Sequence, residues 1–111
     1  MANDLGKTST GIQPNVAALL SYVLGVITGI IFFIIEKENK FVRFHAMQSI
    51  IIFGGLFVLQ LMLVFIPVIG AILVPVISIV SLILWVILMI KAYQGEKFKL
   101  PMIGDIAEKQ A

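Results

Sequence analysis

The fold is decided by residues 46–90, which read AMQSIIIFGGLFVLQLMLVFIPVIGAILVPVISIVSLILWVILMI and contain no charged side chain. As one helix rising about 1.5 Å per residue, this stretch would be about 67 Å long. The hydrocarbon core of a bilayer is about 30 Å thick. The stretch therefore predicts two membrane crossings, joined by a turn near Pro67 to Gly70.

A second uncharged run, residues 16–35, lies upstream and is long enough for a third crossing. The two runs are separated by EKENK at residues 36–40, whose four charges must lie in water. We therefore predict an all-α integral membrane protein with three transmembrane helices, at about 16–35, 41–66 and 68–90. Pro75 either kinks the third helix or starts it, and both alternatives are open at this point.

The segments at the two ends of the chain are polar. Residues 1–15 are rich in Gly, Ser and Thr and are predicted to form a disordered tail. Residues 16–91 are predicted to form the transmembrane domain, and residues 92–111 a cytoplasmic interfacial tail. In that tail, Asp105 and Glu108 resemble a helix capping box with Asp in place of Ser or Thr.

Lysine and arginine residues are distributed unevenly between the two predicted sides of the membrane. With three crossings, one side carries only Lys7. The other side carries seven cations: Lys37, Lys40, Arg43, Lys91, Lys97, Lys99 and Lys109. Because cytoplasmic loops carry an excess of Lys and Arg, the chain is predicted to be N-out and C-in. We expect a multi-pass protein of the cell (plasma) membrane of a prokaryote.

Composition argues against several classes of protein. The chain is 60% hydrophobic and only 13% charged, whereas a soluble domain carries roughly 25% charged residues. It has no cysteine and one histidine, His45, so a metal site would lack the usual ligands. No charged residue lies within the predicted membrane core, and no nucleophile–base set or phosphate loop occurs. We therefore expect no enzyme activity, no cofactor, no bound metal, no nucleic-acid partner and no identifiable small-molecule substrate.

Small residues recur at every fourth position of the predicted first helix. They are Ala17, Ser21, Gly25 and Gly29. Such a stripe lets a second helix backbone approach closely. Two interpretations are open, namely packing against the protein's own helices and self-association between copies.

Polar residues share one face of the predicted second helix. His45, Ser49 and Gln60 fall within about 60° of one another at about 100° per residue, and Gln48 flanks them. Polar groups at membrane depth need partners, so this face should point into the bundle. On the third helix, Ser78, Ser81 and Trp85 form a similar stripe, and the serines could meet Gln60.

Two interpretations of these polar stripes are open. One is a core whose hydrogen bonds are satisfied, and the other is a polar path for an ion, a solute or a peptide. The candidate functional segment comprises Arg43, His45, Gln48, Ser49 and Gln60.

Basic residues flank the predicted membrane core and are candidate contacts for anionic lipid headgroups. Asn39 can cap the second helix, whose first turn would lie at headgroup level with Arg43 directed outward. The candidate headgroup contacts are Lys40, Arg43, Lys97 and Lys99.

Three stretches together carry a resemblance to a known family: LSYVLG at 20–25, EKENKFVRFHAMQS at 36–49, and YQGE at 93–96 with PMIGD at 101–105. The chain resembles small prokaryotic membrane proteins of the Tic20-like family, related to the membrane subunit of the chloroplast inner-envelope import translocon. The resemblance implies no catalytic residues. It directs attention to Arg43, His45 and Gln48.

We therefore carry three hypotheses of function. The first is a non-enzymatic scaffold or accessory subunit of membrane machinery, for example in protein translocation or insertion. The second is a homo-oligomeric channel for ions or small solutes, and the third is a surface protein that binds anionic lipid. The expected partners are the lipid bilayer and either further copies of the chain or a larger membrane complex.

Overall fold

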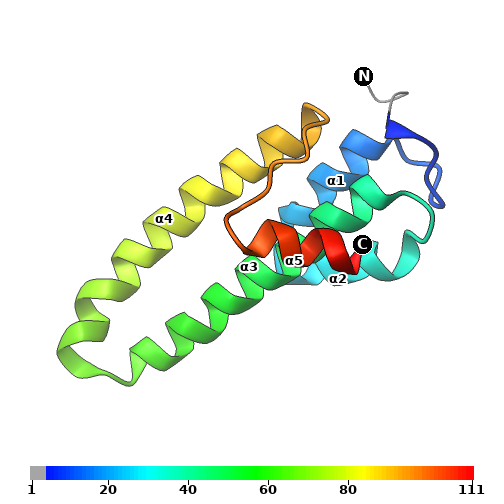
Figure 1. Cartoon of the computed structure of the whole chain (residues 1–111). Helices are drawn as coiled ribbons and strands as arrows, with labels where there is room; N and C mark the ends of the chain where they lie inside the picture. Colours follow the sequence, from blue (N-terminus) through cyan, green and yellow to red (C-terminus); the bar gives the residue numbers. More distant parts are fainter. Residues whose placement is uncertain (1–4) are drawn as a thin grey trace.

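The computed structural model describes residues 5–111, which form five helices and no strand (Figure 1). The helices are α1 (Pro14–Val23), α2 (Val26–Ile35), α3 (Lys40–Val64), α4 (Pro67–Tyr93) and α5 (Ile103–Gln110). The predicted all-α class is confirmed. The first four residues of the tail that we expected to be disordered lie outside the described residues.

Helices α3 and α4 form a long hairpin. The Asn39 side chain accepts a hydrogen bond from the Val42 amide at 3.1 Å, so it caps α3 as predicted. Pro67 occupies the first turn of α4, where its missing amide hydrogen has no cost. Pro75 lies inside α4, so this helix begins at Pro67 and does not begin at Pro75.

Only α3 and α4 are long and apolar enough to cross a membrane, among the helices of residues 5–111. The predicted single helix at 16–35 is wrong, because the chain breaks at Leu24 and Gly25 into α1 and α2, of ten residues each. Gly25 has φ +62° and ψ −120°, a conformation that residues with a Cβ rarely adopt. Each of the two short helices is about 15 Å long, half the thickness of a hydrocarbon core.

The break lies deep in the apolar part of the sequence, and its backbone polar groups are bonded. The Thr28 hydroxyl accepts a hydrogen bond from the Leu24 amide at 3.1 Å and donates to the Ser21 carbonyl at 3.2 Å. Irregular backbone is tolerated in a membrane only where protein groups satisfy it. Thr28 therefore closes the turn from within the helix pair.

Two further donors reach the same turn from the long hairpin. The Ser49 hydroxyl of α3 donates to the Gly25 carbonyl at 2.9 Å, and the Trp85 indole of α4 donates to the Tyr22 carbonyl at 2.6 Å. Side chains from both long helices thus hold the tip of the short pair against the hairpin.

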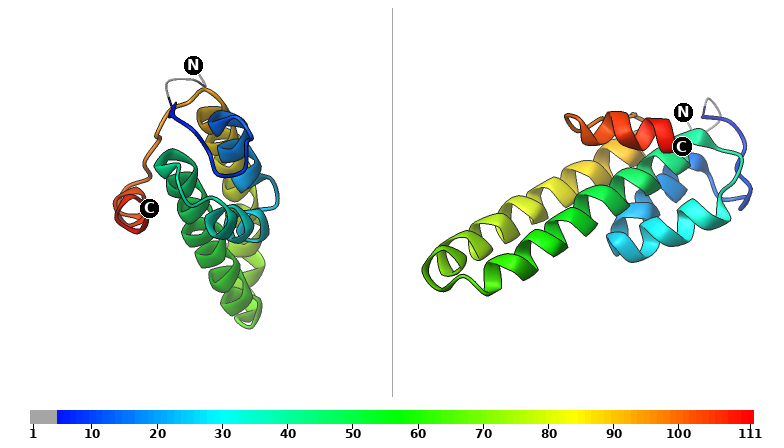
Figure 2. Two further views of the ribbon diagram at one scale, coloured as in Figure 1. Left: turned by 90° about the vertical axis from the view of Figure 1, so that its right-hand side faces the viewer. Right: turned by 60° about the horizontal axis from the view of Figure 1, so that its bottom comes forward.

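The short helices enter and leave at the same end of the molecule (Figure 2). The Ser9 amide donates to the Glu36 carboxylate at 2.7 Å, and the Asn39 amide group donates to the carbonyls of Leu5 and Lys7 at 2.8 and 3.1 Å. The three predicted crossings and the N-out orientation are therefore not confirmed. The tail and the 36–40 link, which we expected on opposite sides, lie side by side.

The main clusters of buried apolar residues lie at the end of the hairpin that α1 and α2 cover. Tyr22, Phe41, Leu88 and Ala92 are among their buried members. Beyond Phe53 and Trp85, α3 and α4 pack only against each other, and most of their large apolar side chains are exposed, although Leu63 is buried. An exposed surface of this kind is suited to lipid and not to water.

Candidate functional site at the polar end of the bundle

The polar segments of the described chain gather at one end, which we call the polar end. It comprises residues 5–13, the link 36–39, the C-terminal strap at residues 94–102, and α5 (Figures 1 and 2). The strap begins at the end of α4 and leads to α5, which lies across α3.

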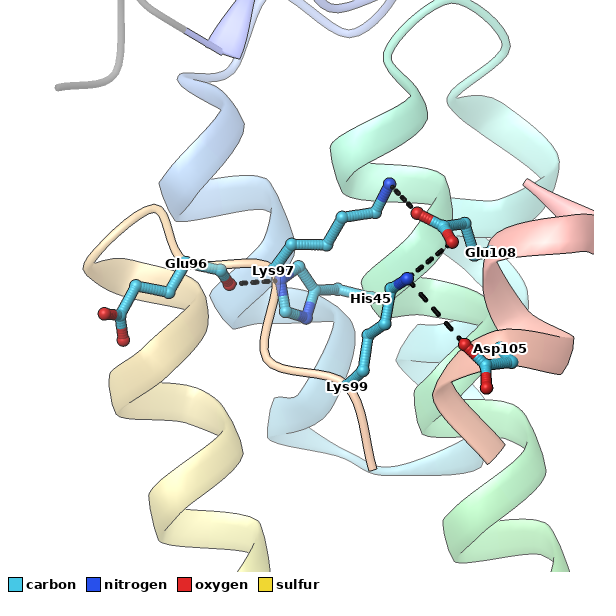
Figure 3. A network of polar contacts seen from close by, with 6 residues as sticks. All are labelled: His45, Glu96, Lys97, Lys99, Asp105 and Glu108. Carbon is cyan, nitrogen blue, oxygen red and sulfur yellow. Dashed lines mark hydrogen bonds and ion pairs between the residues drawn. The ribbon is translucent and has the colours of Figure 1, made fainter. Parts of the chain in front are cut away.

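A buried hydrogen-bond network joins α1 and α3 at this end. The Tyr22 hydroxyl lies 2.7 Å from Nδ1 of His45 and accepts a hydrogen bond from Nε2 of Gln48 at 3.0 Å. Nε2 of His45 lies 2.9 Å from the Glu96 carbonyl oxygen (Figure 3). Because a carbonyl can only accept, Nε2 carries the imidazole proton and Nδ1 accepts from Tyr22. His45 thus links α1 to the strap.

Gln48 binds the backbone of the strap at two points. Its Nε2 donates to the Phe98 carbonyl at 2.9 Å, and its Oε1 accepts from the Leu100 amide at 3.0 Å. Together with the bond to Tyr22, these contacts use both amide hydrogens and the amide oxygen of a fully buried side chain. Gln48 therefore acts as a clamp on the strap.

Ion pairs join the strap to α5. Lys97 lies 2.8 Å from Glu108, and Lys99 lies 2.6 Å from Glu108 and 3.7 Å from Asp105 (Figure 3). The hydrogen bonds from Lys97 and Lys99 lower the pKa of Glu108 to about 2, and the bond to Glu108 raises the pKa of Lys99. Asp105 is not a helix cap, since α5 begins after Met102 without a side-chain cap. The capping-box prediction is wrong.

Arg43 is directed inward, so its predicted outward orientation is wrong. Its guanidinium donates to the carbonyls of Phe33 and Glu36 at 2.9 and 2.8 Å, and to the Ala111 carbonyl at 3.1 Å. It also lies 4.0 Å from the centre of the Phe33 ring. The last carbonyls of α2 lack donors within the helix, and the Arg43 guanidinium provides the missing hydrogen bonds. Among the predicted headgroup contacts, Lys40 is exposed, while Lys97 and Lys99 are paired.

Glu36 is buried in the link and binds three backbone amides. They belong to Ser9, Glu38 and Asn39, at 2.7 to 3.2 Å. Burial alone would raise the pKa of this carboxyl, but the hydrogen bonds to the charged form outweigh burial and lower the pKa. Glu36 therefore ties the N-terminal segment to the start of α3.

The small-residue stripe points into the molecule. Ala17 and Ser21 are fully buried. A Cβ on Gly29 would lie 3.0 Å from the Ala46 carbonyl oxygen, so α2 and α3 approach closely at this position. The stripe is divided at Gly25, so Ala17 and Ser21 lie on α1 and Gly29 lies on α2.

The polar residues of the stripes on α3 and α4 make their contacts at separate places in the molecule. His45 and Gln48 belong to the polar end, and Ser49 and Trp85 to the turn between α1 and α2. Gln60 donates to the Ser78 hydroxyl at 2.8 Å in the exposed half of the hairpin, as the sequence suggested. The polar residues thus form local contacts at three depths and not one line.

Sequence reasoning missed three residues of these networks. The sequence pattern marked Tyr22 and Glu36 only as parts of a helix and of a charged link, and it did not single out Thr28. The signal available for Thr28 was its place between Gly25 and Gly29, where a hydroxyl can bond to a broken helix backbone. Within residues 5–111, no group of three or more His, Cys, Asp or Glu residues could hold a metal ion.

Comparison with known proteins places the chain in a family. The model of the magnetosome magnetite crystal formation protein family (MamF_MmsF) matches residues 10–107. The chain belongs to this family. The predicted Tic20-like membership is wrong, because the matching model and the relatives below belong to other groups.

The similar relatives are archaeal membrane proteins. A UPF0132 membrane protein of Methanocaldococcus jannaschii is 58% identical over 105 residues, covering 95% of this chain and 94% of the relative. A UPF0132 membrane protein of Archaeoglobus fulgidus is 55% identical over 98 residues, covering 88% of this chain and 95% of the relative. No solved structure matches. This MamF_MmsF family member is therefore a membrane protein, in agreement with its two long apolar helices.

Proposed function

We propose that this family member is a non-enzymatic scaffold of the prokaryotic plasma membrane, with two crossings and one re-entrant helix pair. In this topology α3 and α4 cross the bilayer, whereas α1 and α2 enter and leave on the same side. The observation that carries the proposal is the bonding of the N-terminal segment to the link, from Ser9 to Glu36 and from Asn39 to Leu5. A membrane cannot lie between segments in direct contact.

The charge distribution supports this topology. The chain contains eight Lys and Arg residues, and with two crossings all eight lie on the side of the polar end. The turn between α3 and α4, at residues 65–66, carries none. An excess of cations marks the cytoplasmic side, so we propose that both termini face the cytoplasm.

The way in which polar side chains are used supports a structural role. Glu36, Asp105 and Glu108 all bond or pair with groups of the same chain. The family description names magnetite crystal formation. Because at least one oxygen of each of these three carboxylates is already engaged within the chain, we place the role of this chain in organising a membrane and not in binding a mineral. The chain would act as an accessory subunit whose polar end offers a fixed cytoplasmic surface.

The channel and lipid-binding hypotheses have weaker support. Gln60 and Ser78, which would line a pore, bond to each other. Lys97 and Lys99, which would bind headgroups, pair with Glu108. We therefore propose neither as the main function.

Single-cysteine labelling tests the topology, and the absence of native cysteine makes each introduced thiol unique. The variants are Lys7→Cys, Glu38→Cys, Lys109→Cys and Val68→Cys. In intact cells, a membrane-impermeant maleimide should label only the Val68→Cys variant, and the other three only after permeabilisation. Labelling of Lys7→Cys from outside, with Glu38→Cys protected, would restore three crossings and overturn the proposal.

Photocrosslinking tests the scaffold role. A photoreactive residue in place of the exposed Lys40 should capture a protein at the polar end. Val68, at the opposite end, gives the matched position for contacts with lipid. Recovery of lipid alone from both positions would contradict an accessory subunit.

A further inference from the structure

We infer that this protein favours membrane that is convex on the side of its polar end, and helps to form it. The inference rests on the proposed two-crossing topology and adds a mechanical activity to it. In that topology the two leaflets contain unequal numbers of helices.

The short helices accompany only half of the hairpin. Along α4, α1 is bonded from the contact of Asn15 with the Tyr93 carbonyl, at 3.0 Å, to that of Trp85 with the Tyr22 carbonyl, at 2.6 Å. Along α3, α2 runs from the contacts of Arg43 down to Phe53, which lies against Gly25. Neither short helix continues past this depth.

The molecule narrows at the tip of the short helices. An open apolar groove of about 600 Å³ lies beneath the turn, between its residues 24–27 and residues 53–58 of α3. Phe57, which lines the groove, is 66% exposed. Beyond the groove only α3 and α4 remain, and Phe65 at the end of α3 is 80% exposed. Figure 2 shows the resulting taper toward the turn between α3 and α4. The whole molecule measures 50 × 22 × 22 Å.

The difference in area between the leaflets is large for a protein of this size. A helix with its side chains is about 10 Å across, so each occupies roughly 80 Å² in cross-section. Four helices in one leaflet and two in the other differ by roughly 150 Å². A bilayer relieves such a difference by curving so that the leaflet with more protein is on the convex side.

The strap and α5 add to the same leaflet. Met102 and Ile106 are exposed at the polar end, with Met102 at 78%, close to the paired cations Lys97 and Lys99. Apolar side chains on a short helix at the interface insert at headgroup level, and such insertion depends on curvature. This contribution has the same sign as that of α1 and α2.

The tapered shape that α1 and α2 give the molecule can act on a membrane because bonds hold the short helices rigidly in place. The tip of the short pair is fixed by Thr28, Ser49 and Trp85, and its base by Glu36 and Arg43. The buried polar groups that form these bonds would be costly to leave without partners in an apolar medium. Lateral pressure from the lipids therefore cannot easily displace α1 and α2 from their positions beside the hairpin.

The experiment uses narrow tubes pulled from giant vesicles of phosphatidylcholine and phosphatidylglycerol that contain the full-length protein in both orientations. An impermeant dye applied outside labels the Lys109→Cys variant only where the polar end faces out. In a parallel sample it labels Val68→Cys only where the polar end faces in. Both positions are exposed, so the substitutions leave the core intact.

The expected result is opposite sorting of the two samples. Dye on Lys109→Cys should be enriched in the tube relative to the flat membrane, with a ratio above one that rises as the tube narrows. Dye on Val68→Cys should be depleted, with a ratio below one. Ratios equal to one, or equal in both samples, would overturn the inference.

A double variant, Lys7→Cys with Lys109→Cys, separates this outcome from a failure of the topology. With both termini on one side, mass spectrometry should find each molecule carrying either no dye or two dyes. Molecules with one dye each would overturn the topology itself. If each molecule carries no dye or two dyes, but the labelled protein is not sorted between tube and flat membrane, only the curvature inference is overturned.

Discussion

Gln48 is the residue at which the helix core and the C-terminal strap meet. Its amide bonds to the Tyr22 hydroxyl, the Phe98 carbonyl and the Leu100 amide, and the side chain is fully buried. A single side chain thus fixes the strap at the level of the polar end. The geometry depends on both ends of the amide, so an apolar side chain of similar size cannot replace it.

Replacing Gln48 with leucine should loosen the strap. Each buried group left without a partner costs about 1–3 kcal/mol, so we expect a loss of at least about 2 kcal/mol in unfolding free energy in mixed micelles. Trypsin should also cleave faster after Lys97 and Lys99. The matched control is Gln94→Leu at an exposed position in the strap. Equal cleavage rates in the two variants would show that Gln48 is not the clamp.

Glu36 gives the fold a dependence on acid. Its pKa is lowered in the folded protein from the ordinary 4.5, although burial opposes this, because three backbone amides bond to the charged form. The unfolded chain therefore binds a proton at higher pH than the folded chain. The stabilisation is complete above about 4.5 and is lost as the pH falls through the lowered value.

The Glu36→Gln variant should remove this part of the pH dependence. Between about pH 6 and about pH 3, the wild-type protein should lose more unfolding free energy than the variant. Thermal unfolding in detergent at both pH values measures the difference. Glu108, whose pKa is also lowered, is present in both proteins and cancels in the comparison. Parallel losses would contradict the role of Glu36.

At the scale of elements, the contact of α2 with α3 depends on a missing side chain. A Cβ on Gly29 would lie 3.0 Å from the Ala46 carbonyl oxygen and 3.2 Å from Ser49. A side chain at position 29 would force these neighbours to shift, so glycine favours the close approach of the two helices. At Gly55 of α3, by contrast, an added Cβ would meet no atom within 4 Å other than those of the adjacent helix backbone.

Leucine at Gly29 should force α2 away from α3. Overpacking of this kind costs about 1–3 kcal/mol, whereas Gly55→Leu should be close to neutral or stabilising, because leucine favours a helix. Unfolding in mixed micelles gives the two free energies. The prediction fails if the Gly55→Leu variant is the less stable of the pair.

At the scale of the whole molecule, the exposed half of the hairpin is matched to lipid. Phe57 and Phe65 have similar exposure, but Phe57 lies near the middle of the uncharged part of α3, residues 46–64, and Phe65 lies at the turn. In water, lysine would be tolerated at both positions. In a bilayer, a charge at the centre is costly and one at the interface is not.

The Phe57→Lys variant should therefore be destabilised by roughly 3 kcal/mol and the Phe65→Lys variant by much less. Unfolding of the protein reconstituted in vesicles measures both values. Equal tolerance of the two lysines would show that this half of the hairpin does not lie in lipid as described.

The sequence predicted the long hairpin well and the short helix pair badly. Whether Pro75 kinks its helix or starts it was open in the sequence, and the structure places it inside α4. The cap at Asn39 and the contact of Gln60 with Ser78 follow from local patterns or helical spacing. The break at Gly25 does not. Its partners Ser49 and Trp85 come from distant parts of the chain, and no local pattern reports which carbonyl they bind.

The sequence by itself determined that this protein lies in lipid, because the hydropathy of a segment measures its transfer from water to hydrocarbon. That transfer is the same for a helix that crosses and for a helix pair that turns back. Only the tertiary structure decided between them, through the bonds that satisfy the turn and those that tie Ser9 to Glu36. These bonds form between segments that the folded helices bring together, so the side on which the tail lies is a property of the packing.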